Sequence, residues 1–221
     1  MITLHHLNNS RSQRVLWLLE ELGLPYEIVR YQRQPDMRAP AELRAIHPLG
    51  KSPVITDNAY TIAESGAIAE YLTETYGDGR LIPLPKTAER LRYTYWLHYA
   101  EGSAMPPLLL KLLFTLMPKR APALLRPVVR KVANQALTAL VNPMLKQHMA
   151  FWESELGKSE WFAGNEFTVA DIQMSFPLEA AAARAGLDQG HPKAMAFLDR
   201  IHARPAYQRA LEKGGPYSVG R

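Results

Sequence analysis

Two short stretches carry residue types that could hold an acidic, peptide-like ligand. The first is Gly50-Lys51-Ser52-Pro53-Val54-Ile55, in which a proline stands between a small polar residue and an apolar β-branched pair. Proline cannot donate to a strand ladder, so Pro53 belongs at the first position of an edge strand or in a turn. A cis Ser52–Pro53 bond would turn the backbone N–H and C=O of Ser52 outward, toward a ligand.

The second stretch is Ile62-Ala63-Glu64-Ser65-Gly66-Ala67-Ile68. Glu64 and Ser65 precede an apolar pattern at helical spacing, so they either cap an ordinary helix or bind a ligand there. A helix N-terminus with a carboxylate, a hydroxyl and unbonded backbone N–H groups is a site for an anionic group. Together the two stretches predict a clamp for a peptide-like acid.

The elements that must position these stretches follow from hydrophobic periodicity and from Gly and Pro punctuation. The first part of the chain predicts the order βαβαββα, which is that of a thioredoxin-like domain. Its expected elements are strands 2–7 and 26–31, helices 11–22 and 40–46, hairpin strands 53–56 and 60–62, and helix 65–76.

The remainder of the chain predicts helices only. They are expected at 86–104, 106–117, 123–156 with an interruption near Pro143, 168–184, 192–203 and 205–213. The fold class is therefore an α/β thioredoxin-like N-terminal domain (1–78), a linker (79–87) rich in helix breakers, and an all-α domain (88–221).

Composition narrows the class of protein. The chain of 221 residues has a formal charge of +5 and no cysteine, which excludes disulfides and thiolate metal sites. The histidines lack metal-site spacing, so we expect no metal. We expect no secretory signal and no transmembrane segment, and we predict a cytoplasmic protein.

Charge is concentrated in one segment. Between Glu101 and Glu153 there is no acidic residue, whereas seven Lys and Arg residues fall in that gap. Such a segment attracts anionic ligands, membranes or nucleic acid, or is simply a solvated helix face, which we favour. Because no nucleic-acid-binding motif accompanies it, we expect no nucleic-acid partner.

The two stretches, the N-terminal run Ser10–Glu27 and the segment Phe167-Thr168-Val169-Ala170-Asp171 together resemble the cytosolic glutathione transferases, of a bacterial type with a serine in the active-site loop. The resemblance spans nearly the whole chain. Thr168 and Asp171 correspond to a capping box, which we interpret as structural.

The resemblance implies that Ser10 is the catalytic residue. Serine-using classes place this residue four positions before an arginine, here Arg14, and its hydroxyl donates to the thiolate of glutathione. The N-terminus of the following helix lowers the pKa of the thiol in the same direction. Alternatives are Asn8 and Asn9 through their amide groups, Arg11 through its charge, and a plain helix cap at Ser10.

The other glutathione contacts also follow from the resemblance. The backbone of Ser52, before a cis Pro53, pairs with the cysteinyl part. Glu64 takes the ammonium and Ser65 the carboxylate of the γ-glutamyl end, and Lys51 reaches the glycyl carboxylate. The second-substrate pocket is expected where the two domains face each other, at Tyr95, Tyr99 and Phe114, with Met105, Leu109 and Leu112.

The implied function is a transferase that activates the glutathione thiolate for attack on a small hydrophobic electrophile or a peroxide, with a role in detoxification. Glutathione is a cosubstrate, no other cofactor is implied, and a homodimer is expected. The alternatives are a non-catalytic glutathione-binding or stress-regulatory protein on the same fold, and a lipid-surface protein that binds through residues 108–131.

Overall fold

The computed structural model describes residues 1–34, 38–215, 217 and 219. The N-terminal part is a four-stranded mixed sheet with strand order β2-β1-β3-β4. Strand β1 pairs parallel to β2 and antiparallel to β3, and β3 forms a hairpin with β4. The strands are β1 (Ile2–Leu7), β2 (Tyr26–Tyr31), β3 (Val54–Asp57) and β4 (Tyr60–Ala63). This confirms the thioredoxin-like prediction.

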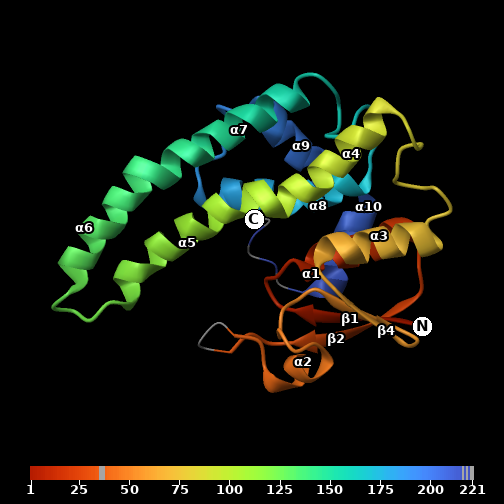
Figure 1. Cartoon of the computed structure of the whole chain (residues 1–221), viewed down its shortest axis with the longest axis horizontal. Helices are drawn as coiled ribbons and strands as arrows, with labels where there is room; N and C mark the ends of the chain where they lie inside the picture. Colours follow the sequence, from red (N-terminus) through yellow and green to blue (C-terminus); the bar gives the residue numbers. More distant parts are fainter. Residues whose placement is uncertain (35–37, 216, 218, 220–221) are drawn as a thin grey trace.

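Three helices cover this sheet, namely α1 (Ser12–Leu22), α2 (Ala41–Ile46) and α3 (Ser65–Tyr76). Helices α1 and α3 lie between the sheet and the helical part of the chain, and α2 lies on the opposite side (Figure 1). Helix α1 is buried on nearly all sides, because it packs on β1, α3, α8 and α10. Gly23 ends it with φ +65°, a left-handed conformation that glycine adopts without strain.

The rest of the chain is helical, as predicted. Its helices are α4 (Ala88–Tyr99), α5 (Met105–Arg120), α6 (Arg126–Ala136), α7 (Asn142–Leu156), α8 (Val169–Arg184), α9 (Pro192–His202) and α10 (Pro205–Gly214). Among the described residues, no helix is both long enough and apolar enough to cross a membrane.

Two helix boundaries differ from the prediction. The predicted break before Pro106 is absent, because the π-helical turn Ala100–Ala104 joins α4 to α5. A second π-helical turn, Leu137–Val141, precedes Pro143 and joins α6 to α7. Proline lacks an N–H and crowds the carbonyl one turn earlier, so a local change to wider π-helical bonding lets the chain continue as a helix.

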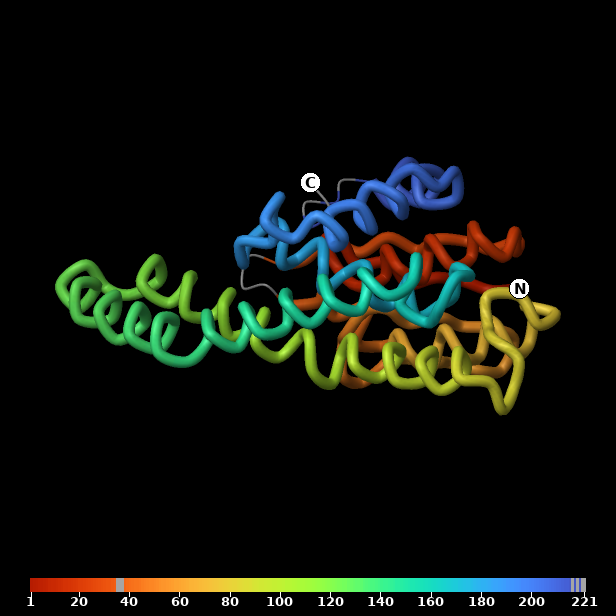
Figure 2. Tube along the Cα trace, turned by 90° about the horizontal axis from the view of Figure 1, so that it is seen from above, coloured from red at the N-terminus to blue at the C-terminus, as the bar shows by residue number. Residues whose placement is uncertain are grey.

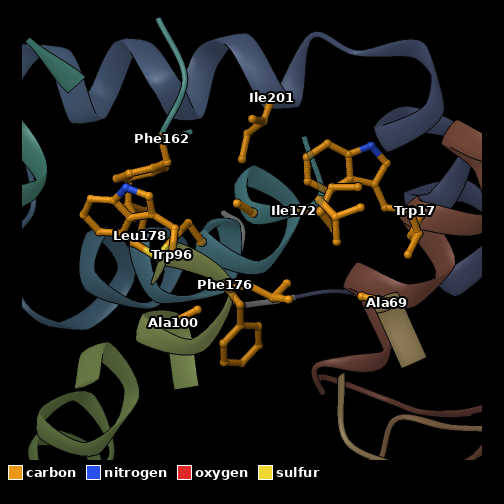
Figure 3. Close-up of a cluster of buried hydrophobic side chains, with 14 of the residues drawn as sticks. Trp17, Ala69, Trp96, Ala100, Phe162, Ile172, Phe176, Leu178 and Ile201 are labelled. Atoms are coloured by element: carbon orange, nitrogen blue, oxygen red, sulfur yellow. The ribbon is translucent and has the colours of Figure 1, made fainter. Parts of the chain in front are cut away.

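Helix α8 is the centre of the core. All its residues from Val169 to Ala181 are buried. Its side chains pack against helices of both parts of the chain, with Ile172 beside Trp17 of α1 and Leu178 near Trp96 of α4 (Figure 3). Since α8 contacts both α1 and α4, it fixes the N-terminal unit against the helical bundle.

The N-terminus of α8 is held by a buried carboxylate, as the capping box predicted. Asp171 accepts the backbone N–H groups of Thr168 and Phe162, each at 2.8 Å. Burial raises the pKa of Asp171 to about 6 despite these hydrogen bonds. The carboxylate thus ties the loop before α8 to the helix.

Replacing Asp171 by alanine should lower the free energy of unfolding by about 2 kcal/mol, because two buried N–H groups lose their acceptor. Urea unfolding of the variant and the wild type measures the difference. Asp199→Ala, in α9, is the control and should change stability by less than about 0.5 kcal/mol. Equal losses in the two variants would contradict a structural role for Asp171.

The basic segment lies on a helical hairpin. The end of α5 and the start of α6 project beyond the rest of the molecule in both views (Figures 1 and 2). Lys119, Arg120, Arg126, Arg130 and Lys131 on this hairpin are all exposed. These positions fit a solvated helix face.

Candidate functional site

Five residues from separate parts of the N-terminal unit gather around one cavity of about 160 Å³. They are the residues that the sequence assigned to glutathione, namely Lys51, Ser52, Pro53, Glu64 and Ser65. The loop before β3 supplies the first three, and the start of α3 supplies the other two. The structure thus forms a two-sided cavity where the sequence predicted a clamp.

The Ser52–Pro53 peptide bond is cis, as predicted. The side chain of Ser52 is tied to β1, where its hydroxyl donates to the carbonyl of His5 (3.2 Å) and accepts the N–H of Leu7 (3.3 Å). These contacts fix the loop before β3 against the strand that leads to α1.

The hydroxyl of Ser65 is positioned to donate a hydrogen bond. Its Oγ accepts from Arg14 Nη2 (3.1 Å) and from Gln173 Nε2 (3.3 Å). Both acceptor positions of the oxygen are then used, so its proton is left for a further acceptor. Because Ser65 lines the cavity, an anionic oxygen in the cavity could accept a hydrogen bond from this hydroxyl.

Glu64 precedes α3 with an unusual backbone conformation. Its φ is +69°, in the left-handed region that residues other than glycine rarely adopt. Strained residues of this kind gather at ligand sites, where the surrounding structure holds them in place. The side chain of Glu64 is exposed and lines the cavity.

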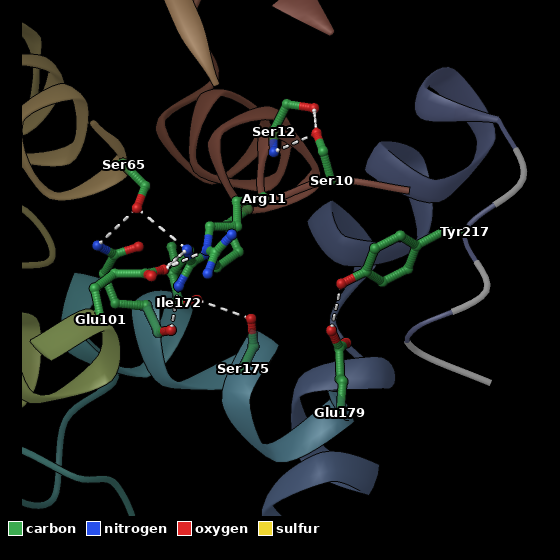
Figure 4. Close-up of polar contacts among 11 residues, drawn as sticks. Ser10, Arg11, Ser12, Ser65, Glu101, Ile172, Ser175, Glu179 and Tyr217 are labelled. Atoms are coloured by element: carbon green, nitrogen blue, oxygen red, sulfur yellow. Dashed lines mark hydrogen bonds and ion pairs between the residues drawn. The ribbon is translucent and has the colours of Figure 1, made fainter. Parts of the chain in front are cut away.

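A network of charged groups adjoins the cavity, and two of its members, Arg11 and Glu101, line it (Figure 4). Arg14, only 2% exposed, bonds to Ser65, to the carbonyl of Gln173 (2.6 Å) and to Glu101. Glu101 also accepts from Arg11 Nε at 2.8 Å. Burial alone would raise the pKa of Glu101, but the charges of Arg14 and Arg11 outweigh it and hold that pKa below its usual value.

Sequence reasoning missed this network, since Arg14 served only to mark the spacing from Ser10. Its partners lie far along the chain, on the π-helical turn Ala100–Ala104 and on α8. The one available signal was an arginine within the otherwise apolar face of α1.

The histidine at position 47 also lines the cavity, and its Nδ1 is buried without a hydrogen-bond partner in the described part of the chain.

Ser10 lies at the junction of β1 and α1 and is buried. Its Oγ is 2.8 Å from the hydroxyl of Ser12 and 3.3 Å from the hydroxyl of Ser52, and it accepts the backbone N–H of Ser12 at 3.2 Å. It therefore reaches the cavity wall through Ser52. Ser12 continues the network to His6 Nδ1 (2.9 Å). Burial lowers the pKa of His6 to about 4, so this imidazole is neutral at neutral pH.

A larger cavity, of about 790 Å³, adjoins the smaller one at Arg11, which lines both. Asn8 and Asn9, the alternatives to Ser10, line this larger cavity. Its apolar wall comes mainly from α5 and α8 and includes Met105, Leu108, Leu109, Leu112 and Phe176.

Tyr95, Tyr99 and Phe114, expected at the second-substrate pocket, lie elsewhere. Tyr99 is buried against α7, where its hydroxyl bonds to His148 and accepts from Trp152 Nε1 (3.2 Å). Tyr95 stacks on Tyr99, one helical turn away. Phe114 lines a separate cavity on the projecting hairpin. For Phe114 the reason is helical phase, because α5 turns Leu108, Leu109 and Leu112 toward the larger cavity and Phe114 away from it.

The chain matches known proteins over its whole length. Residues 1–74 match the family model for the N-terminal domain of glutathione S-transferase, and residues 116–205 match that for its C-terminal domain. Glutathione S-transferase 3 of Schizosaccharomyces pombe is 37% identical over 96% of this chain and 88% of its own length. Glutathione S-transferase GstB of Escherichia coli is 31% identical over 96% and 98%.

Solved structures agree with this. A glutathione S-transferase from Actinobacillus pleuropneumoniae has a TM-score of 0.81 at 33% identity, covering 100% of this chain and 96% of its own. A sphingomonad glutathione S-transferase complexed with glutathione has a TM-score of 0.73 at 25% identity, covering 96% and 98%. The chain therefore belongs to the glutathione S-transferase family.

Proposed function

We propose that this protein is a glutathione transferase that binds glutathione in the smaller cavity and holds its thiol as a thiolate beside Ser10. The observation that carries the proposal is the gathering of Lys51, Ser52, Glu64 and Ser65 around one cavity, next to the β1–α1 junction. The second substrate then occupies the larger cavity, which adjoins the first at Arg11.

Each end of glutathione has a partner of suitable chemistry. Arg14 and Gln173 both donate to the oxygen of Ser65. The Ser65 hydroxyl therefore donates its own hydrogen bond to the γ-glutamyl carboxylate. Glu64 accepts from the adjacent ammonium, and the backbone of Ser52 pairs with the cysteinyl unit. Lys51, exposed at the rim, reaches the glycyl carboxylate as a point charge.

Thiol activation rests on the β1–α1 junction. When the sulfur arrives, the Ser10 hydroxyl turns its proton from Ser12 or Ser52 to the thiolate. The N-terminus of α1 adds its partial positive charge, and Arg11 adds a full one. A hydrogen bond to an anion contributes about 1.5–3 kcal/mol, or about one to two pKa units. Since a free thiol has a pKa of about 8.5, this suffices to make thiolate a major species at neutral pH.

The thiolate then forms a bond to the electrophilic carbon of a substrate held in the larger cavity, and the leaving group departs with the electron pair of the broken bond. With a peroxide, the sulfur would instead attack an oxygen, and a second glutathione would complete the reduction to disulfide, alcohol and water. Product analysis with a chloronitrobenzene and with cumene hydroperoxide separates the two reactions.

The family resemblance also leads us to propose a homodimer in which α4 packs across a two-fold axis. Leu91 and Tyr95 of α4 are 75% and 48% exposed, so they are available for such a contact. Analytical ultracentrifugation measures the oligomeric state directly.

Replacing Glu64 by alanine should weaken glutathione binding roughly tenfold. The ammonium loses a hydrogen bond to a charged group, which contributes about 1.5 kcal/mol to the binding free energy. Calorimetry measures the affinity. Glu70→Ala, an exposed glutamate farther along α3, is the matched control and should leave the affinity within about twofold. A folded Glu64→Ala variant with wild-type affinity would rule out this role.

A further inference from the structure

The hairpin formed by the end of α5 and the start of α6 projects beyond the rest of the molecule in both views (Figures 1 and 2). Its tip, residues 119–126, presents two adjacent leucines to solvent, since Leu124 is 90% exposed and Leu125 is 54% exposed. A single exposed leucine is ordinary on a protein surface. Two neighbouring leucines at the end of a projecting element are placed to enter an apolar phase without any change in the fold.

Five cationic side chains flank these leucines along the chain, and all of them are exposed. They are Lys119 and Arg120 at the end of α5, and Arg126, Arg130 and Lys131 at the start of α6. Within the described part of the chain, none of the five forms an ion pair or a side-chain hydrogen bond. The reason is that no acidic residue occurs between Glu101 and Glu153. The positive charge of the hairpin tip is therefore available to a partner.

A groove of about 440 Å³ lies between the two helices at this tip. Three of the five cations line it, namely Lys119, Arg126 and Arg130, together with the hydroxyl-bearing Thr115. No residue described along its walls carries a carboxylate. Guanidinium and ammonium groups beside a hydroxyl donor match the oxygens of a phosphate group. Phe114 adds an apolar surface to the same groove.

The leucines and the cations together indicate which polyanion fits. A nucleic acid would be held through its phosphates, and the two leucines would then lie in water without a role. An anionic bilayer has phosphate groups at its surface and hydrocarbon just beneath them. Because the leucines lie at the turn of the hairpin and the cations on the helices behind it, the leucines reach the hydrocarbon while the cations stay at the phosphates.

We propose that the hairpin tip is a docking surface for anionic phospholipid bilayers. Leu124 and Leu125 insert among the acyl chains, and a lipid phosphate is held in the groove by the three cations that line it. The contact is reversible, because two leucines bury little apolar area. It does not rest on the proposed function, since none of these residues lines the glutathione cavity or the larger cavity.

Co-sedimentation with vesicles tests the leucines. Wild-type protein should bind vesicles of equal parts phosphatidylcholine and phosphatidylglycerol at least about tenfold more tightly than vesicles of phosphatidylcholine alone, because each cation near an anionic surface strengthens binding roughly fivefold. The variant Leu124→Ser/Leu125→Ser should bind the mixed vesicles about tenfold more weakly than the wild type. Leu84→Ser is the matched control and should stay within about twofold of the wild type. Leu84 is 76% exposed and belongs to the segment 79–87, at the opposite end of the molecule (Figure 1).

A second pair of variants tests the cations. Arg126→Gln/Arg130→Gln should weaken binding to the mixed vesicles about twentyfold, the product of two lost cations. The control Lys86→Gln/Lys193→Gln removes two exposed cations outside the hairpin and should stay within about twofold of the wild type. Added salt should weaken binding of the wild type, since it screens the attraction. Thermal unfolding of each variant should match that of the wild type, so that a loss of binding reports on the surface.

Any of three results would overturn the proposal. The first is a wild type that does not bind the mixed vesicles. The second is a leucine variant that binds them as tightly as the wild type, and equally tight binding of duplex DNA would then assign the surface to a nucleic acid. The third is a hairpin tip covered by a second copy of the chain, which would appear as a leucine variant with an altered sedimentation coefficient in the absence of lipid, together with no vesicle binding.

Discussion

Replacing Arg14 by methionine should lower the free energy of unfolding by about 2–3 kcal/mol, because a buried charged donor is lost from three acceptors, one of which is the partly exposed Glu101. Arg14 is 2% exposed and bonds to Glu101, Ser65 and the carbonyl of Gln173. Methionine fills a similar volume but removes the Arg14 donor from all three acceptors; Glu101 keeps Arg11 and Ser65 keeps Gln173 as donors, whereas the carbonyl of Gln173 loses its side-chain partner. Chemical denaturation of both proteins measures the loss.

The matched control is Arg11→Met, the same substitution three residues earlier. Arg11 pairs with the same Glu101 oxygen, but its side chain is 36% exposed, so its loss should cost no more than about 1 kcal/mol. Equal losses in the two variants would mean that burial of Arg14 does not matter. Because Arg14 also donates to Ser65, the folded fraction of Arg14→Met should bind glutathione more weakly than the wild type does.

Replacing Ser10 by alanine should lower conjugation at neutral pH by about ten- to a hundredfold while leaving glutathione bound. The hydroxyl donates to the sulfur and not to the ends of the peptide, so its loss affects the thiolate by about 1.5–3 kcal/mol. A donor favours the charged form, so its removal raises the thiol pKa, and higher pH should restore part of the activity. The rate, measured between pH 6 and 9, reports this recovery.

The fold was largely predictable because its signals are local. The apolar face of α1, the glycine at position 23 that ends it, and the alternation in β2 each lie within one short segment. The π-helical turns before Pro106 and Pro143 were not predictable, since a proline alone indicates a break. Whether the helix ends or changes its hydrogen bonding depends on tertiary packing, of the first turn against α8 and of the second turn against α5.

The glutathione clamp was predictable for the same reason, since Lys51-Ser52-Pro53 and Glu64-Ser65 are contiguous motifs. The supporting network was not, because Arg14 and Glu101 are separated by 87 residues. The second-substrate pocket also depends on tertiary packing. Tyr99 and Leu112 both fit an apolar helical stripe, and only the arrangement of α4, α5 and α7 decides that the first meets His148 and the second lines the cavity.

The central claim, that Ser10 holds glutathione as a thiolate, is tested most directly by the ultraviolet absorbance of the bound thiolate, titrated against pH. In the wild type the transition should lie below that of free glutathione, and in Ser10→Ala it should move up by about one to two pH units. Superimposed curves for the two proteins, with glutathione bound in both, would contradict the claim and leave Ser10 as a helix cap. Asn8, Asn9 and Arg11 would then be the candidates for the thiol contact.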